Sequence, residues 1–190
     1  MAFDPRAAIF AAWIAFLIAW VMVAGWSARA ASHDDFGVES PSRVLSIAAI
    51  VMMLVAFRPQ GLGVIWTMPA WFGWPLFAVV VSGFAFAFWG RLHLGPLWSN
   101  AVSPTDAHRI VDTGPYGVVR HPVYAGILLA ALATAAELGR VEAVAGAASL
   151  IAALSFRAKM EERALRRDVS DADYTKYRAR VPMLIPGLRG

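Results

Sequence analysis

The sequence contains no cysteine, which excludes disulfide bonds, thiolate nucleophiles, c-type haem attachment and cysteine-ligated metal clusters. Charged residues are also scarce. They make up 16% of the 190 residues whereas apolar residues make up 59%, a composition outside the range of soluble domains. Three of the four histidines, His33, His93 and His108, lack the spacing of a metal site, so we expect no bound metal. The composition therefore predicts a protein embedded in a lipid bilayer.

Five uncharged, apolar stretches alternate with polar segments and predict five membrane-spanning helices. A span needs about 20 apolar residues, and the first stretch has this length. Pro69 and Pro75 interrupt a longer uncharged run, so we interpret residues 66–74, which include three tryptophans, as a segment at the membrane interface. The predicted spans are residues 7–26, 44–57, 75–90, 122–136 and 144–156.

The predicted fold class is all-α: an integral membrane helical bundle of about five transmembrane helices with a helical C-terminal tail. Small residues recur along the fourth and fifth spans and permit two backbones to approach closely, so we expect these spans to form a tight antiparallel hairpin. In the tail, residues 157–168 are rich in helix formers, and residues 170–173 have the spacing of a capping box that opens a second helix. That helix would place Tyr174, Tyr177 and Val181 on one face, a pattern typical of an amphipathic surface helix.

Basic residues are distributed unevenly and predict the orientation in the membrane. With five spans, fourteen of the seventeen Lys and Arg residues fall on the side of residues 91–120 and the tail, and three fall on the other side. Positively charged loops stay inside, so the amino terminus is expected outside and the polar residues 91–120 inside, together with the tail. A basic tail so close to a membrane indicates contact with membrane lipids and not with nucleic acid.

Residues 108–126 have a composition that neither a lipid-facing helix nor a simple loop requires: two histidines, two arginines, two prolines, two tyrosines and three glycines. His121 precedes Pro122, so a helix is predicted to begin there with free amides that point toward the polar segment. Such a helix end favours an anion, for instance a carboxylate or a phosphate. The turn at 114–117 displays Tyr116, although a plain connecting turn has the same composition. This segment is the predicted functional site.

Two adjacent glutamates, Glu161 and Glu162, follow the fifth span close to membrane depth, where an ionised carboxylate is costly without a partner. They either face a bound cation or form ordinary salt bridges with Arg157 and Arg166, about one helical turn away. Neighbouring helical residues point about 100° apart, so the two carboxylates are not expected to contact the same ligand atom.

An ordered set of motifs connects these features. It comprises His108-x-x-Val111, Gly114-Pro115-Tyr116, Arg120-His121-Pro122-x-Tyr124-x-Gly126, the helical hairpin, Glu161-Glu162, Tyr174-x-x-Tyr177 and Arg180-Val181-Pro182. Together these motifs resemble the isoprenylcysteine carboxyl methyltransferase family over about residues 91–188, whereas the first three spans match only in being apolar. In that family the fold is a helical membrane bundle, and S-adenosylmethionine binds in a cytosol-facing pocket formed by the C-terminal half.

The resemblance implies a role for each matching residue. Glu162 would hold the charged end of the cofactor, and Arg157 would orient the substrate carboxylate as the catalytic arginine. The implied cofactor-binding residues are His108, Arg109, Ile110, Val111, Tyr116, Arg120, His121, Pro122, Val123, Tyr124, Gly126 and Glu162. Two positions depart from the family pattern: a glutamine of the eukaryotic members falls at Ala101, and their substrate arginine has no counterpart at Ala158, although Arg157 is adjacent. The substrate is therefore left open.

The predicted organisation is an N-terminal part of three spans, residues 1–90, and a catalytic part, residues 91–190, with the cofactor loop, the hairpin and the tail. The predicted reaction is S-adenosylmethionine-dependent methylation of a carboxylate on a lipophilic or prenylated substrate that enters from the bilayer. The expected location is a bacterial inner membrane with the active site facing the cytosol. A sulfonium methyl group is already activated, so the protein need only align it with the nucleophile and exclude water.

Three alternatives remain open from the sequence. The first is methyl transfer to a lipid amine or a small thiol. The second is an NADPH-dependent membrane reductase of the sterol type, because such reductases resemble the same C-terminal half. The third is a non-catalytic membrane protein that binds a lipid or a partner. A carboxylate nucleophile needs no general base, and a pair of acids favours a cationic sulfonium over the phosphates of NADPH, so carboxylate methylation is preferred.

Overall fold

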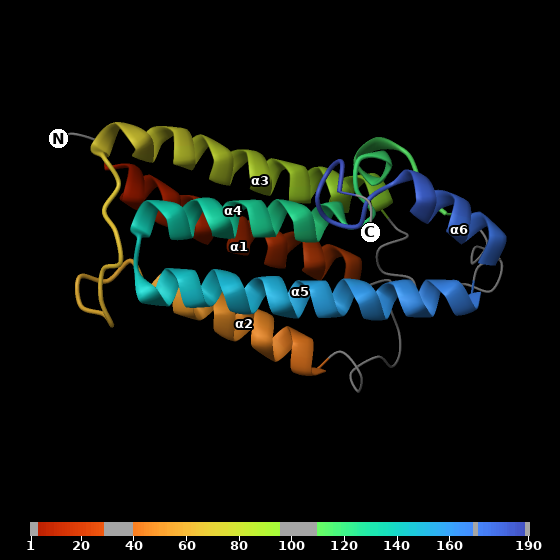
Figure 1. Cartoon of the computed structure of the whole chain (residues 1–190), viewed down its shortest axis with the longest axis horizontal. Helices are drawn as coiled ribbons and strands as arrows, with labels where there is room; N and C mark the ends of the chain where they lie inside the picture. The colour runs from red at the N-terminus through yellow and green to blue at the C-terminus, as the bar shows by residue number, and fades with distance from the viewer. Residues whose placement is uncertain (1–3, 29–39, 96–109, 169–170, 189–190) are drawn as a thin grey trace.

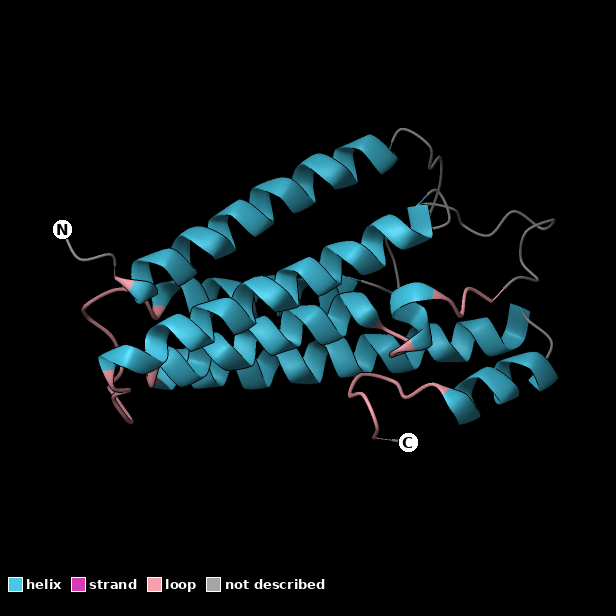
Figure 2. Cartoon of the chain, turned by 90° about the horizontal axis from the view of Figure 1, so that it is seen from above, coloured by secondary structure: helices cyan, strands magenta, loops and turns pink. Residues whose placement is uncertain are grey.

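The computed structural model describes residues 4–28, 40–95, 110–168 and 171–188. Its main elements are five long helices that run side by side, and a short helix, α6, that lies at one end of the bundle (Figure 1). Apart from one isolated bridge between Val64 and Arg140, these residues form helices and loops only, as Figure 2 shows. The all-α prediction is therefore confirmed. The helices are α1 (Pro5–Ala28), α2 (Ser40–Val55), η1 (Ala70–Phe72), α3 (Gly73–Leu94), η3 (Gly114–Gly117), α4 (Pro122–Leu138), α5 (Val141–Asp168) and α6 (Asp171–Arg180).

Three helical stretches among the described residues are long and apolar enough to cross a membrane, Pro5–Val23, Ala70–Leu94 and Val141–Arg163. Two further apolar helices, Val44–Val55 and Pro122–Leu138, are shorter. At 1.5 Å per residue, α4 is about 26 Å long, a little less than the ~30 Å of the hydrocarbon core. These five helices correspond to the five predicted spans, and the chain is an integral membrane protein.

The helices pack in the order α1, α3, α4, α5 and α2. The sequence suggested that the small residues of α4 and α5 allow these two helices to pack closely on each other. Instead, the glycines of both helices mainly face the outer helices α3 and α2. Gly126 of α4 faces α3, where an added Cβ would collide with the carbonyl oxygen of Gly83. Gly146 of α5 faces α2, where an added Cβ would lie 2.5 Å from the side chain of Met53. The hairpin of α4 and α5 is thus held from both sides by outer helices that approach it at glycines.

α5 is one continuous helix of 28 residues, and not a span of 144–156 followed by a separate tail helix of 157–168. The sequence holds no glycine or proline between residues 147 and 168, so the change from apolar to charged residues does not interrupt the helical hydrogen bonds. At 1.5 Å per residue the helix is about 42 Å long, which exceeds the hydrocarbon core. Part of α5 must therefore lie outside the hydrocarbon core, and we expect this to be its charged C-terminal part, with Glu161 and Glu162 near the boundary.

α3 continues to Leu94, so the division predicted between residues 90 and 91 falls inside a helix. Aromatic rings fill the contact between α1 and α3: Phe16 stacks on Phe84 with ring centroids 4.2 Å apart, and Trp13 meets Phe84 edge-on. The indole of Trp13 also donates a buried hydrogen bond to the hydroxyl of Thr134 in α4 at 2.9 Å. Helices from both predicted parts thus share one core.

The turn between α4 and α5 fixes the end of the bundle that is remote from α6 (Figure 1). Gly139 ends α4 in the left-handed conformation, with φ of 58°, and its amide bonds to the carbonyl of Ala135. The same residue accepts a hydrogen bond from the amide of Ile65 at 2.6 Å. The predicted interfacial segment 66–74 therefore consists of a loop held on this turn, the short η1 and the first residues of α3.

Candidate active site

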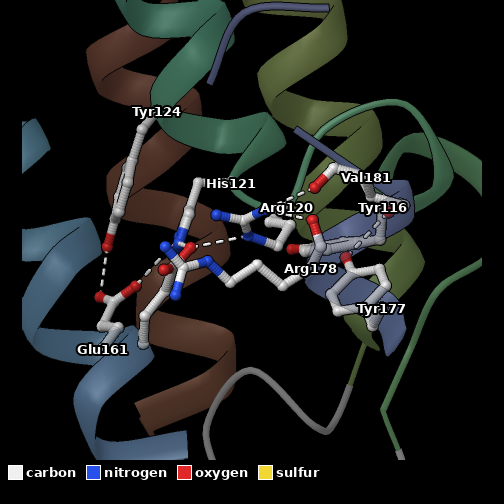
Figure 3. Close-up of polar contacts among 9 residues, drawn as sticks. Tyr116, Arg120, His121, Tyr124, Glu161, Tyr177, Arg178 and Val181 are labelled. Atoms are coloured by element: carbon white, nitrogen blue, oxygen red, sulfur yellow. Dashed lines mark hydrogen bonds and ion pairs between the residues drawn. The ribbon is translucent and has the colours of Figure 1, made fainter. Parts of the chain in front are cut away.

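The polar residues of the candidate site gather where α4 begins and α5 leaves the bundle (Figure 3). The segment that follows α6 pairs with the chain just before α4: the amide of Arg120 bonds to the carbonyl of Pro182 at 2.8 Å, and the amide of His121 bonds to that of Met183 at 3.1 Å. These two bonds bring the tail over the start of α4. The prediction that the polar segment and the tail lie on the same side of the bundle is thereby confirmed for the described residues.

Arg120 is the buried cation of the site. Its side chain is 4% exposed, and its Nε donates to Oε1 of Glu162 at 2.7 Å. Its Nη1 donates to the backbone carbonyls of Arg178 and Val181. Burial of a guanidinium costs folding free energy unless its N–H donors form hydrogen bonds. These contacts therefore hold α5 and the tail against Arg120, just before the start of α4.

His121 lies between the two glutamates. Its Nδ1 is 3.5 Å from Oε2 of Glu161, and its Nε2 is 3.5 Å from Oε1 of Glu162. Burial lowers the pKa of His121, but the interactions with the two carboxylates outweigh burial, so the net pKa lies above its ordinary value of 6.5. The imidazole also stacks on the ring of Tyr124, with centroids 5.5 Å apart. His121 is thus favoured in its charged form at the centre of the site.

Glu161 is the second anchor of the site, which the sequence had placed there only as a neighbour of Glu162. It accepts a hydrogen bond from the hydroxyl of Tyr124, and it pairs with Arg157 one turn earlier on α5, with Nε and Oε1 3.0 Å apart. The two adjacent carboxylates diverge, as expected, but they contact opposite nitrogens of the same imidazole. The salt bridge predicted between Glu161 and Arg157 is confirmed.

Glu162 is buried, with 8% of its surface exposed, and its partners are Arg120 and His121. The side chain of Arg166, its other possible partner, lies outside the described residues. Glu162 therefore does not lie on the exposed face of α5.

Tyr116 and Tyr177 join the loop to α6. The hydroxyl of Tyr177 donates to the backbone carbonyl of Tyr116 at 2.8 Å, and the ring of Tyr116 stacks on His93 at the end of α3. Burial raises the pKa of Tyr116, with further contributions from Tyr177 and Glu161, while Arg91 opposes them. Both tyrosines thus stay neutral and act here as packing and hydrogen-bonding groups.

α6 presents the face predicted from its sequence, since Tyr174, Tyr177 and Val181 are all buried. This face packs on Ile110 of the loop, however, and not on a membrane surface. At the outer edge of the contact, Arg180 pairs with Asp112. α6 therefore closes the site from the tail side, and the interpretation as a simple surface helix is corrected.

The chain was compared with models of known protein families, and part of it matches one of them. Residues 76–167 match the family model described as the isoprenylcysteine carboxyl methyltransferase (ICMT) family. This region of the chain is similar to the ICMT family. It covers most of α3, the loop to η3, α4 and nearly all of α5, and hence the residues of the site outside the tail. Comparisons with curated proteins and with solved structures gave no match. This similarity suggests a membrane methyltransferase of the isoprenylcysteine type.

The structure brings together some of the residues that the resemblance to the ICMT family implied. Tyr116 lies beside the core of the site, and His108 and Arg109 lie outside the described residues. Gly126 faces α3, so any part it has in the cofactor pocket stays a prediction. The residues whose contacts form the core of the site are Arg120, His121, Tyr124 and Glu162, whereas Pro122 and Val123 begin α4 with side chains toward Gly90 of α3. Ile110 packs on α6, and Val111 follows it in the loop.

Two residues of the ICMT-family site were missed by sequence reasoning. Glu161 was assigned only the ordinary pairing with Arg157, although its position beside Glu162 and one turn after an arginine was a signal for a shared network. His93 was considered only as a metal ligand, and no feature of the sequence indicated its hydrogen bond to Thr113 at 3.0 Å or its stacking on Tyr116.

Proposed function

We propose that this chain is an S-adenosylmethionine-dependent methyltransferase that transfers a methyl group to the carboxylate of a lipophilic substrate. The observation that carries the proposal is a pair of adjacent carboxylates, the partly exposed Glu161 and the buried Glu162, on both sides of His121 at the start of α4, within a region similar to the ICMT family. When bound, S-adenosylmethionine supplies an activated sulfonium methyl group. The protein contributes by binding the reactants, orienting them and excluding water from the site.

The residues of the site fit a cofactor that has both a positive and a negative end. Glu162 contacts Arg120 and His121 through Oε1, which leaves its Oε2 to accept from an ammonium group. Nε2 of His121 is buried and forms no hydrogen bond with any described group, so a ligand could satisfy it. The first amides of α4, at Val123 and Tyr124, follow Pro122 and suit a carboxylate.

Arg157 is the proposed partner of the substrate carboxylate. It lies one turn before Glu161 on the face of α5 next to Tyr124, and Glu161 holds its Nε at 3.0 Å. This contact fixes the plane of the guanidinium, which matters because arginine binds carboxylates through two parallel hydrogen bonds. Phe156, adjacent to it in the sequence, is 57% exposed, and we expect its ring to face lipid. A lipophilic or prenylated acid can therefore bring its carboxylate to Arg157 while its apolar part remains in the bilayer.

The contacts of the site argue against the alternative cofactor NADPH. Its extra phosphate requires an available cation, but Arg120 is buried and already paired with Glu162 and two backbone carbonyls. The neighbouring Glu161 and Glu162 would repel a phosphate. An amine or thiol acceptor would have to lose a proton before or during transfer, whereas a carboxylate acceptor needs no base. The charge distribution of the chain, with its basic tail beside the site, supports an orientation toward the cytosol.

The first test is the unfolding temperature of the purified protein with S-adenosylmethionine, S-adenosylhomocysteine or NADPH. A ligand at a hundred times its dissociation constant adds about 2.7 kcal/mol of stability, which is readily measured. The proposal predicts a rise with the first two ligands and none with NADPH. A rise with NADPH alone would indicate a reductase, and no rise with any of the three would indicate a non-catalytic protein.

A second experiment tests the acceptor. The protein is incubated with S-adenosylmethionine labelled in the methyl group and with an isoprenoid acid, the corresponding isoprenoid amine or the isoprenoid thiol. The proposal predicts that label enters the organic extract with the acid only and is released as methanol by mild base, as a methyl ester requires. Base-stable label with the amine or the thiol would contradict the carboxylate assignment while leaving methyl transfer intact.

A further inference from the structure

The end of the bundle opposite the candidate site contains a cavity of about 710 Å³. It lies where the start of α1, the end of α2 and the turn between α4 and α5 meet, remote from α6 (Figure 1). A volume of 300–1,000 Å³ is typical of sites for small ligands. None of the residues that line it belongs to the methyl-transfer site, so it requires an explanation of its own.

Three arginines from three different segments line this cavity: Arg6 in α1, Arg58 after α2 and Arg140 in the turn after α4. The lining holds one acidic residue, Asp4, so its formal charge is +2. Two of the arginines also contact glutamates behind the cavity wall, Arg6 with Glu137 at 3.3 Å and Arg140 with Glu142 at 3.9 Å. Asp4 and these two glutamates together balance the three arginines in formal charge, so any excess of positive charge toward a bound group comes from the arginine that lacks an acidic contact.

Arg58 carries most of this excess. It is exposed, and none of the contacts found among the described residues gives it an acidic partner. Glu142, the nearest candidate on the turn, already accepts the amide of Leu62 and faces Arg140. An anionic group bound in the cavity would thus meet one uncompensated guanidinium and two that are fixed in position by carboxylates.

The remaining wall of the cavity is apolar. Phe10 of α1 and Leu54 and Val55 of α2 form it, and the rings of Phe10 and Phe57 meet at 5.2 Å where the two helices touch. α1 otherwise packs on α3, and α2 packs on α5, so no helix of the described bundle fills the space between them. This wall belongs to two helices that are predicted to cross the membrane. A soluble anion would use the arginines but not this wall.

We propose that the cavity binds an anionic phospholipid of the surrounding leaflet. Its phosphate group would contact Arg58 and Arg140, because arginine pairs with phosphate through charge-assisted hydrogen bonds. Its acyl chains would lie along the apolar faces of α1 and α2. The site would join two helices that have little direct contact with each other, and it is independent of the methyl-transfer function.

The test compares the full-length protein with two lipids and one soluble headgroup. The unfolding temperature in a mild detergent is measured with phosphatidylglycerol, with phosphatidylcholine of the same acyl chains, and with glycerol 1-phosphate. The expected result is a clear rise with phosphatidylglycerol and a much smaller rise with the other two. An equal rise with both lipids, or with glycerol 1-phosphate, would overturn the proposal, since it would show a general lipid effect or a site for a soluble anion.

Two variants locate the effect. Arg58→Gln removes the uncompensated charge, so the concentration of phosphatidylglycerol needed for half of the rise should increase at least about threefold. Arg163→Gln removes an exposed arginine from the far part of α5 and should leave this concentration unchanged. Equal increases in both variants would show that only the net charge matters and would overturn the proposal.

A third variant covers the case in which Arg58→Gln does not fold. Ala7→Phe places a large side chain in the cavity from an exposed position on α1 and alters none of the arginines. It should reduce the rise caused by phosphatidylglycerol at least as much as Arg58→Gln. An unchanged rise in Ala7→Phe would show that the lipid binds elsewhere and would overturn the proposal.

Discussion

Replacement of Glu162 by Gln probes the centre of the proposed site. The change keeps the size of the side chain and removes only its charge. If Glu162 holds the ammonium group of the cofactor, the affinity for S-adenosylhomocysteine should fall by about 1.5–3 kcal/mol, the contribution of a hydrogen bond to a charged group, which is at least tenfold. The structure adds a second effect. Glu162 is 2.7 Å from the buried Arg120, so the variant should also lose stability, by about 1–3 kcal/mol.

Calorimetric titration with S-adenosylhomocysteine separates these two effects when two further variants are measured. Glu161→Gln removes the other carboxylate beside His121 but leaves the pair of Glu162 with Arg120 intact, so it should weaken binding much less. Arg120→Gln breaks the same ion pair while it keeps the carboxylate of Glu162. Unchanged affinity in Glu162→Gln would refute the assignment of this carboxylate. Equal losses in Glu162→Gln and Arg120→Gln would assign the effect to the broken ion pair instead.

Four other predictions follow from the same contacts. Arg157→Ala should raise the KM for an acid substrate or abolish turnover with nearly unchanged S-adenosylhomocysteine affinity, and an equal loss of both in kinetics and titration would show a structural role. Because the pKa of His121 lies above 6.5, the stability that it contributes is complete below pH 6.5 and is lost as the pH rises through that pKa; thermal melts between pH 6 and 9 should therefore show a fall that His121→Gln lacks. Gly126→Ala should lower the unfolding free energy by about 1–3 kcal/mol, because its Cβ would collide with Gly83 and force α3 away from α4, and a melting temperature equal to that of the wild type would contradict this packing. A label in the turn at residues 137–142 should react with an impermeant reagent from outside the cell, whereas one in the tail should react only from inside; the reverse pattern would exclude a cytosolic site.

The membrane helices were readable from the sequence because each rests on a local signal. Pro122 opens α4 where it was expected, since its fixed φ angle and missing amide suit the first helical turn, and Gly139 ends that helix in the left-handed conformation. The length of α5 was underestimated for a physical reason. The charges that begin at Arg157 mark the boundary of the hydrocarbon core, but they do not interrupt helical hydrogen bonding, so the helix passes through the boundary.

The candidate site was readable only in part, because its main contacts join distant parts of the chain. Arg120 and Glu162 are 42 positions apart, and Tyr116 and Tyr177 are 61 apart, so no local pattern could pair them. The sequence correctly predicted that the neighbouring carboxylates of Glu161 and Glu162 diverge and do not contact the same atom. The prediction did not include one further possibility. An imidazole has two nitrogens on opposite sides of its ring, so two diverging carboxylates can both contact it.

The two backbone bonds from Arg120 and His121 to Pro182 and Met183 also set an order for the assembly of the protein during synthesis. A ribosome makes the chain from its amino terminus, so all five apolar helices are synthesised before the partners of these two amides exist. Arg120 must therefore wait, without the carbonyls of Arg178 and Val181, until the residues that follow α6 have been made. The site is thus completed only after the last long helix of the bundle has been synthesised.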